Sequence, residues 1–385
     1  MMEGRQGLFP EQPLPAWRRA VLKVGSSLLA ADGGGLSPRY ATAIARFVSD
    51  AQRSGREVVI VSSGAVAAGR AIVHRQPTAG AAMAERQALA ALGQAQLIGF
   101  WQGFFEKPVA QVLLTHDDLR NRRRYLNARA TLLELLRCGA LPVVNENDTV
   151  SVDELKLGDN DNLAAIVAAL VDADLLLIAT DIDGLHDADP RMHPDARPVP
   201  MVERMDAAVL ATAGGVGSQV GTGGMRTKLE AAQRAASAGV ATVLFNGRRA
   251  GVLEGLASGT LKGTLILATC SRVTARKHWL RNAPAEQGGI IVDQGAASAL
   301  VDKGASLLPG GIVSAHGDFR RGDIVEVGVI DAEGGSGGAR IARGISQYSA
   351  ADIRRIARRH SRDIEASLGY NYGDTIIHRD DLVVL

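Results

Sequence analysis

Residues 141–181 decide the fold that the sequence predicts, and they read LPVVNENDTVSVDELKLGDNDNLAAIVAALVDADLLLIATD. The apolar run Leu141–Val144 is a predicted strand that stops at the polar cluster Asn145–Asp148. A second polar cluster, Gly158–Asn162, precedes a buried helix predicted over Leu163–Val171. Asn and Asp favour turns and helix caps, so one cluster alone indicates only a loop. Two clusters beside buried elements indicate a polar ligand site at the carboxyl edge of an open α/β sheet.

Buried strands and helices alternate over residues 20–265, which predicts an α/β domain with a largely parallel sheet sandwiched by helices. We expect strands at 20–25, 57–61, 109–114, 141–144, 175–179 and 240–245. We expect helices at 37–54, 65–70, 84–105, 120–138, 163–171, 203–213 and 225–238. Residues 254–263 are expected to form a helical turn and a loop, and residues 183–200 a loop.

The pattern changes beyond residue 285, where short apolar runs broken by glycines predict a small, mostly β second domain. The predicted parts are a loose N-terminal extension over 1–18, the α/β domain over 19–270, a linker over 271–285, the β domain over 286–364 and a C-terminal tail over 365–385. The segment Gly334–Gly338 is expected to be a hairpin loop.

The composition is that of an ordinary globular protein, with 46% hydrophobic and 22% charged residues among 385. A formal charge of +2 does not by itself indicate nucleic-acid or membrane binding. Cys138 and Cys270 form no CxxC motif, so neither a disulfide framework nor a zinc site is implied, and we expect a cytoplasmic protein. No apolar run approaches the length of a membrane span.

Lys23 lies inside the strand expected at 20–25. A buried lysine is costly unless it meets an anion, so either this is an edge strand with Lys23 in water or an anion lies beside it. Ser62-Ser63-Gly64 follow the next strand and precede a helix, a pattern typical of anion-binding helix N-termini and equally of an ordinary serine cap.

The segment Thr222–Lys228 places glycines, a hydroxyl and a lysine at the start of a predicted helix, as a polyphosphate requires. A flexible loop with a surface lysine is the alternative. The sequence has no G-x-x-x-x-G-K-[ST] motif, and no G-x-G-x-x-G follows its first strand, so a P-loop and a dinucleotide fold are disfavoured.

Together these segments favour phosphoryl transfer, which needs cations around the migrating group and little covalent chemistry from the protein. Lys23 and Lys228 are the expected cations, and Asp161 is expected to hold both. The expected acceptor-binding residues are Ser63, Asp148 and Asn160. The expected nucleotide-binding residues are Lys23, Thr180, Asp181, Thr222, Gly223, Gly224, Met225, Arg226, Thr227 and Lys228. Mg²⁺ is expected to be carried by ATP rather than by a dedicated protein site.

Several motifs resemble the glutamate 5-kinase group of the amino acid kinase family. They are VLKVGSS at 21–27, VSSGAVAAGR at 61–70, NENDTV at 145–150, KLGDNDNLAA at 156–165, TDIDGL at 180–185 and GTGGMRTK at 221–228. The resemblance spans nearly the whole chain in order and spacing. Residues 310–323 resemble part of a PUA module.

The resemblance implies ATP- and Mg²⁺-dependent phosphorylation of the γ-carboxylate of L-glutamate to γ-glutamyl phosphate, the first step of proline biosynthesis. It also implies that Lys23 contacts the phosphate, that Ser63, Asp148 and Asn160 bind glutamate, and that Thr180, Asp181 and Thr222–Lys228 form the ATP site. Feedback inhibition by proline, a homo-oligomer (dimer or tetramer) and contact with γ-glutamyl phosphate reductase are further expectations.

Two alternatives stay open. Another member of the family would phosphorylate acetylglutamate, aspartate or a small phosphate, although the paired polar clusters favour glutamate. The PUA-like module offers an RNA-binding role, but basic and acidic residues balance over 286–363, which disfavours it. Arginines at 354, 355, 358, 359 and 362 are expected to form one solvated helix face.

Overall fold

The computed structural model describes residues 9–30, 32–73, 83–151, 160–190, 192–212, 224–271, 288–330 and 339–385, with 274, 275, 277, 280 and 281. The chain forms two compact units. The first reaches to Ser271, and the second is Arg272–Leu385 together with Asn121–Leu126.

Within the described residues, the first unit contains a nine-stranded sheet in the order β1-β9-β8-β6-β2-β3-β5-β4, with β7 beside β9. Its strands are β1 Glu11–Pro13, β2 Arg19–Val24, β3 Glu57–Ser62, β4 Val109–Leu114, β5 Leu141–Glu146, β6 Leu175–Thr180, β7 Met201–Val202, β8 Ala241–Asn246 and β9 Thr260–Ile266. The strands from β8 to β4 are all parallel, and β9 runs antiparallel to β8 and to β1. The prediction of a largely parallel α/β sheet is confirmed.

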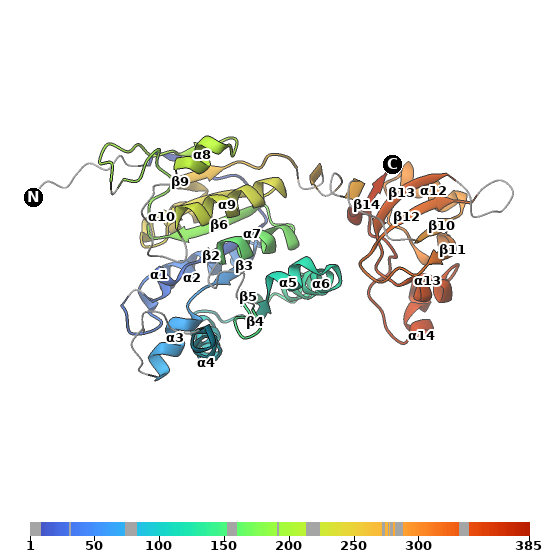
Figure 1. Ribbon diagram of the computed structural model, residues 1–385, viewed down its shortest axis with the longest axis horizontal. Coiled ribbons are helices and arrows are strands. Elements are labelled where there is room, and N and C mark those ends of the chain that lie inside the picture. Colours follow the sequence, from blue (N-terminus) through green and yellow to red (C-terminus); the bar gives the residue numbers. More distant parts are fainter. Residues whose placement is uncertain are drawn as a thin grey trace, which may run out of the picture. The chain divides into compact units, whose positions relative to one another are not determined.

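Helices cover both faces of this sheet (Figure 1). They are α1 Ser26–Leu29, α2 Pro38–Arg53, α3 Ala65–Val73, α4 Met83–Gln102, α5 His116–Arg120, α6 Arg122–Arg137, α7 Asn160–Leu170, α8 Ala207–Thr212, α9 Met225–Ser237 and α10 Ala250–Ser258. The start of α2 follows from its sequence, because the Ser37 side chain accepts a hydrogen bond from the Arg39 backbone and Pro38 occupies the first helical position.

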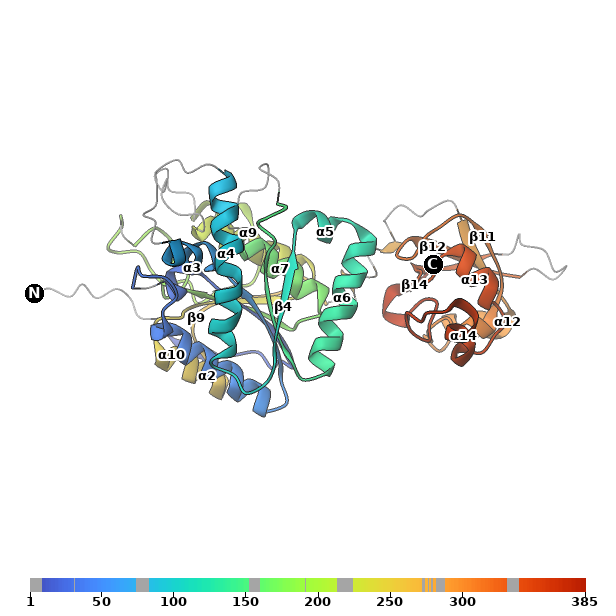
Figure 2. The same cartoon turned by 90° about the horizontal axis from the view of Figure 1, so that it is seen from below.

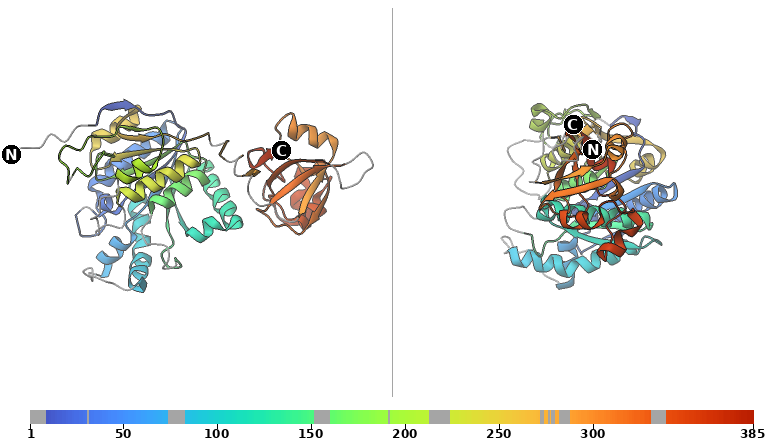
Figure 3. Two further views of the ribbon diagram at one scale, coloured as in Figure 1. Left: turned by 45° about the horizontal axis from the view of Figure 1, so that its top comes forward. Right: turned by 90° about the vertical axis from the view of Figure 1, so that its right-hand side faces the viewer.

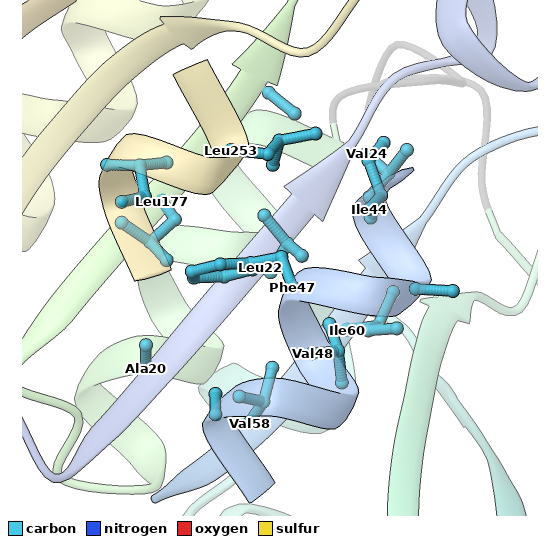
Figure 4. Packing of buried hydrophobic residues seen from close by; sticks show 14 of the residues in the cluster. Ala20, Leu22, Val24, Ile44, Phe47, Val48, Val58, Ile60, Leu177 and Leu253 are labelled. Atoms are coloured by element: carbon cyan, nitrogen blue, oxygen red, sulfur yellow. The ribbon is translucent and has the colours of Figure 1, made fainter. Parts of the chain in front are cut away.

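The alternation of side chains along β2 decides what each face contacts. Ala20, Leu22 and Val24 belong to the main hydrophobic core, together with residues of α2 and α10 (Figure 4). Val21 and Lys23 therefore point to the opposite face. On that face α7 packs against β2, and α7 and α9 lie side by side (Figure 3). Lys23 is thus directed away from the apolar core and toward α7.

The second unit is built on a five-stranded sheet in the order β11-β10-β12-β13-β14, counted over the described residues. Its strands are β10 Gly288–Val292, β11 Ile312–Gly317, β12 Ile324–Val329, β13 Arg340–Ile345 and β14 Leu382–Val384. Its helices are α12 Gln294–Val301, α13 Ala350–Ile356 and α14 Ile364–Leu368, with short 3₁₀ turns at Pro309–Gly311, Ser361–Asp363 and Arg379–Asp381. The expected hairpin loop at 334–338 lies outside the described residues.

Four local predictions need correction. The extension over 1–18 is not loose throughout, because Glu11–Pro13 pairs with β9 and the side chains of Phe9, Leu14 and Trp17 are buried. Residues 254–263 contain the end of α10 and the start of β9, and Gly259 before this strand and Gly263 within it resemble a loop in sequence. The helix expected at 120–138 is interrupted at Asn121, and α8 begins only at Ala207.

The arginines at 354–362 also differ from the prediction, because they do not share one helix. Helix α13 ends at Ile356, and Arg358 adopts a left-handed backbone conformation with φ 64°. The Arg354 guanidinium donates hydrogen bonds to backbone carbonyls of β11, and Arg355 and Arg359 donate to Ser367. These guanidinium groups therefore fasten parts of the second unit together, which weakens the case for a free basic face.

Helices α3 and α4 approach each other closely at two glycines. A Cβ added to Gly93 would lie 1.9 Å from the Ala65 carbonyl oxygen, and one added to Gly69 would lie 1.9 Å from the Leu89 carbonyl oxygen. Neither position has room for a methyl group, so glycine at these sites sets the position of the long helix α4 (Figure 2).

We expect Gly93→Ala to lower the free energy of unfolding by about 1–3 kcal/mol, because the methyl group forces the two helices apart. Gly99→Ala is the matched control on the same helix, since nothing lies within 4 Å of its added Cβ. That control should be neutral or stabilise the helix by up to about 1 kcal/mol. Urea unfolding of both variants measures the difference, and equal stability of the two would contradict the close approach.

Candidate active site

The site lies at the carboxyl ends of the parallel strands, around β2. From β2 the chain moves outward to β3 and on to the edge strand β4, places β5 between them, and then returns to place β6 on the other side of β2. The strand order reverses there, and in open α/β sheets ligands bind in the crevice at such a reversal. Lys23 lies near the carboxyl end of this strand and is 6% exposed. The alternative of an edge strand with Lys23 in water is therefore wrong.

Lys23 and Lys228 meet at one carboxylate. The Lys23 Nζ lies 2.7 Å from Asp161 Oδ1, and the Lys228 Nζ lies 3.3 Å from Asp161 Oδ2. The hydroxyl of Thr227 also donates to Asp161 Oδ2 at 2.8 Å. Lys23 comes from β2, Asp161 from the first turn of α7, and Lys228 from the first turns of α9. The structure thus brings together the three residues for which the sequence predicts catalytic roles.

Burial and the charges within the cluster act together on the pKa values of its residues. Burial by itself would raise the pKa of Asp161, but the ammonium groups of Lys23 and Lys228 outweigh it and hold that pKa below its usual value. Burial also lowers the pKa of Lys228, an effect opposed by Asp161 and reinforced by Lys23. The cluster therefore holds two cations against one anion in a site that excludes most water.

The N-terminus of α9 provides further positive potential. Gly224 precedes the helix in an extended conformation, and no side chain caps its first turn. Amide N–H groups of an uncapped first turn attract anions, and the helix dipole adds to that attraction. Met225 and Arg226, both predicted nucleotide-binding residues, belong to this turn, whereas Thr222 and Gly223 lie outside the described residues.

The neighbouring strand β6 ends in the other predicted nucleotide residues. Thr180 is buried, and its hydroxyl lies 3.3 Å from Asp181 Oδ1. Asp181 is exposed and forms a 3.4 Å ion pair with Arg248, which follows β8. The sequence gives no signal for Arg248, because nothing in the local pattern distinguishes it from a surface arginine after a strand.

On the other side of β2, buried amides and a hydroxyl form a connected chain. The Asn160 Nδ2 donates to Ser63 Oγ at 2.9 Å, to Asn145 Oδ1 at 3.1 Å and to the Ser62 carbonyl at 3.3 Å. The Asn145 Nδ2 donates in turn to Gln94 Oε1 at 2.9 Å. Asn160 and Ser63 were both predicted to bind the acceptor, and the structure places them in direct contact.

Asp148 lies beyond the end of β5 and is half-buried. Burial and the nearby Glu146 carboxylate raise its pKa to about 6, and Arg86 partly offsets this. Glu146 is buried and accepts a hydrogen bond from Ser151 at 2.8 Å. A cationic ligand beside this half-buried carboxylate would stabilise its ionised form.

Three side chains around the site have roles that the sequence did not indicate. Gln94, on α4, and Asn145, at the end of β5, extend the amide chain. Trp101 donates its indole N–H to Ser62 Oγ at 2.9 Å. Asn145 was visible as part of a polar cluster, but Gln94 and Trp101 lie in an apolar helical pattern that gives no signal of a site.

No group of three or more His, Cys, Asp or Glu side chains is placed to hold a metal ion in the part of the chain that the structure describes. Over the same residues, no helix combines the length and hydropathy needed to cross a bilayer. Both carboxylate oxygens of Asp161 face lysine ammonium groups, which compete with a metal ion for them.

Comparison with known proteins extends the likeness over nearly the whole chain. A model of the amino acid kinase family matches residues 18–246, and a PUA domain model matches residues 288–368. Glutamate 5-kinase of Xanthomonas campestris pv. campestris (strain 8004) is 71% identical over 365 residues, covering 95% of this chain and 100% of that protein. Glutamate 5-kinase of Xylella fastidiosa (strain M23) is 67% identical over 377 residues, covering 98% of each. A solved UMP kinase from Bacillus anthracis is 18% identical with a TM-score of 0.47, covering 66% of this chain and 98% of that one.

Proposed function

Because the chain belongs to the amino acid kinase family, we propose that it transfers the γ-phosphoryl group of ATP to the γ-carboxylate of L-glutamate. The product is γ-glutamyl phosphate, and the reaction is the first step of proline biosynthesis. The names of the 67–71% identical relatives support the reaction and its substrate. The family predicted from the motifs is confirmed.

The observation that carries the proposal is the pair of buried ammonium groups on one carboxylate at the reversal of strand order. The attacking γ-carboxylate and the γ-phosphoryl group are both negative, so their repulsion is the main obstacle to reaction. Lys23 and Lys228 offset that charge from two sides, and Asp161 holds both in place before ATP arrives. Preorganised cations of this kind stabilise a transition state without reorganisation of solvent.

The acceptor side fits an amino acid with carboxylates and one ammonium group. The Ser63 Oγ accepts a hydrogen bond from Asn160, so its own hydrogen is free to donate to a carboxylate. The Asn160 Oδ1 is buried and has no hydrogen-bond donor among the described residues. It and the Asp148 carboxylate suit an ammonium group, which has three donors and no acceptor.

The chemical step needs no general base, because the γ-carboxylate is ionised at neutral pH. One carboxylate oxygen forms a bond to the γ-phosphorus while the bond from that phosphorus to the β,γ-bridging oxygen breaks, and ADP leaves with the electron pair. The protein's residues bind, position and neutralise charge, and no side chain becomes covalently attached.

The triphosphate fits the uncapped start of α9 and the Lys228 ammonium, with Thr180 and Asp181 at the nucleoside side of the site. Mg²⁺ supplies charge neutralisation at the phosphates. It would arrive with ATP, held mainly by phosphates and by a carboxylate or water rather than by an all-protein cage.

Release of ADP that depends on both glutamate and ATP tests the proposal, with hydroxylamine added to trap the acyl phosphate as the hydroxamate. Acetylglutamate, aspartate and UMP serve as alternative acceptors. Glutamate is expected to give the highest kcat/KM. Faster turnover of another acceptor would assign the chain to a different reaction within the family.

We predict that Asp148→Ala raises the KM for glutamate about tenfold or more while kcat changes little, because one partner of the substrate ammonium group is lost. In the wild-type protein the KM should also rise as the pH falls below about 6, where Asp148 becomes protonated. Binding of the ammonium group favours the ionised carboxylate, so glutamate binding near pH 6 should release protons. An unchanged KM in Asp148→Ala would remove this residue from the substrate site.

Four further properties complete the proposal, and all rest on the resemblance to the family. They are inhibition by proline, assembly into a homodimer or homotetramer, contact with γ-glutamyl phosphate reductase and a cytoplasmic location. An RNA-binding role of the second unit is not favoured, since its arginines at 354, 355 and 359 are engaged within the unit.

A further inference from the structure

We infer that Gln94 is a positioning residue that fixes the hydrogen-bond polarity of the glutamate site through Asn145 and Asn160. The inference rests on the proposed function and deepens it. Gln94 touches no predicted substrate-binding residue directly, and it lies on α4, outside the strand ends that the sequence motifs mark. It is 9% exposed, and Asn145 and Asn160 are 3% and 4% exposed.

The direction of the hydrogen bond between Gln94 and Asn145 sets the direction of the next one, between Asn145 and Asn160. The Gln94 Oε1 can only accept, so it holds the Asn145 Nδ2 toward α4. The other end of the Asn145 amide, Oδ1, therefore faces α7 and accepts from the Asn160 Nδ2. The Asn160 Nδ2 is thereby committed to protein acceptors, and its Oδ1 is left as an acceptor with no donor among the residues that the structure describes.

Reversed amide orientations would prevent the site from accepting hydrogen bonds from an ammonium group. If Asn145 turned its amide around, its Nδ2 would face the Asn160 Nδ2, donor against donor. Asn160 would then also turn and present its own N–H groups where an acceptor is needed. Because all three amides are buried, water cannot readily restore the lost bonds, and an unsatisfied buried group is costly. The three amides therefore have to turn together, and the orientation in which the Gln94 Oε1 accepts is the one that suits the substrate. The Gln94 Nε2 is itself buried without a hydrogen-bond partner among the described residues.

The position of that oxygen depends on the helix contact described above. Gly93 immediately precedes Gln94 and lies against the Ala65 carbonyl, where no side chain fits. About two turns later, Trp101 of the same helix donates to the Ser62 hydroxyl, next to Ser63. Helix α4 thus supports both the amide chain and the serine of the acceptor site.

The test compares variants at Gln94 by steady-state kinetics. Gln94→Met keeps the length of the side chain but removes the acceptor, and Gln94→Asn is too short to reach Asn145. Both should raise the KM for glutamate about tenfold or more and leave the KM for ATP within about twofold. Gln94→Glu keeps an oxygen that accepts from Asn145 but also buries a carboxyl group, so its KM for glutamate should lie between those of wild type and Gln94→Met.

Glutarate separates this role from a general structural one. It carries the two carboxylates of glutamate but no ammonium group, so its inhibition constant as a competitor of glutamate should change little in Gln94→Met. The preference for glutamate over glutarate should therefore fall about tenfold. Gln102→Met is the matched control, since the hydrogen bonds of Gln102, on the same helix, go to the backbone of residues 105–109 among the described residues. Gln102→Met should lower the stability of the protein without changing the KM for glutamate or the inhibition constant of glutarate.

Three results would overturn the inference. They are an unchanged KM in both Gln94→Met and Gln94→Asn, a parallel loss of glutamate and glutarate affinity, and a Gln94→Glu variant as impaired as Gln94→Met. A wild-type protein without glutamate-dependent ADP release would refute the proposed function, and with it this inference. Circular dichroism establishes that each variant is folded, and if Gln94→Met does not fold, Gln94→Asn carries the comparison.

Discussion

Lys228→Ala is expected to lower kcat by about two to three orders of magnitude, while the KM for glutamate changes little. The Lys228 ammonium is 6% exposed and 3.3 Å from Asp161, on the side of the site where the triphosphate fits. Removal of one preorganised donor that acts on developing charge costs about 10²–10³ in kcat. Initial rates of ADP release at saturating ATP and glutamate measure this loss.

The control is Lys262→Ala, which removes an exposed lysine whose partner is Glu11. Exposed ion pairs contribute little, so its kcat should stay within about twofold of wild type. A kcat of Lys228→Ala that is also within a few-fold of wild type would show that the cation is dispensable, and the proposed mechanism would lose one of its two charges.

Asp161→Asn is expected to destabilise the first unit and to abolish measurable turnover. The change leaves the Lys23 and Lys228 ammonium groups buried together without a carboxylate, and a buried charge that loses its partner costs about 3–5 kcal/mol. For a unit of this size, that cost corresponds to a fall of about 10 °C in Tm. Thermal unfolding with and without ATP measures it, and ATP should stabilise the variant because triphosphate replaces the lost negative charge.

The double variant Asp161→Asn/Lys228→Met tests the cause. If repulsion between two unpaired cations is responsible, removal of one should recover part of the lost stability. Asp50→Asn, which breaks an exposed pair with Arg53, is the control and should change Tm by no more than about 2 °C.

The pH dependence has a definite sign. The pKa of Asp161 is depressed in the folded state, so its contribution is present above its unfolded-state value near 4 and is lost as the pH falls through its folded value. The difference in stability between wild type and Asp161→Asn should therefore persist at neutral pH and shrink only in acid. A double variant less stable than the single one would contradict this account.

Sequence alone predicted the alternating strands and helices of the first unit, because strands buried on both faces read as continuous apolar runs. It failed at β1 and β9. Strand β1 has only three residues and depends on a partner far away in sequence, since Glu11 pairs with Lys262. Local patterns carry no information about such a partner, so an edge strand at the N-terminus resembles a loose extension. Strand β9 is longer, but Gly259 before it and Gly263 within it resemble a loop.

The residues of the candidate site divide in the same way, into those that the local sequence reveals and those that only the fold reveals. Residues with unusual chemistry in buried surroundings, such as Lys23 and the two Asn- and Asp-rich clusters, were visible because charge within an apolar pattern requires a reason. Gln94 was not visible, because a glutamine on an amphipathic helix is ordinary until its neighbours in space are known. Its partner Asn145 is 51 residues away and belongs to a different element.

The sequence by itself determined the fold class, the family and the residue types at the ends of the strands, because these depend on periodicity and on local motifs. Only the tertiary structure decided which of two readings of Lys23 holds, that Asp161 joins it to Lys228, and which way each amide of the acceptor site points. The physical reason is that burial and hydrogen-bond direction are properties of pairs of atoms. Those pairs are brought together by folding from positions as much as 138 residues apart, as in Lys23 and Asp161.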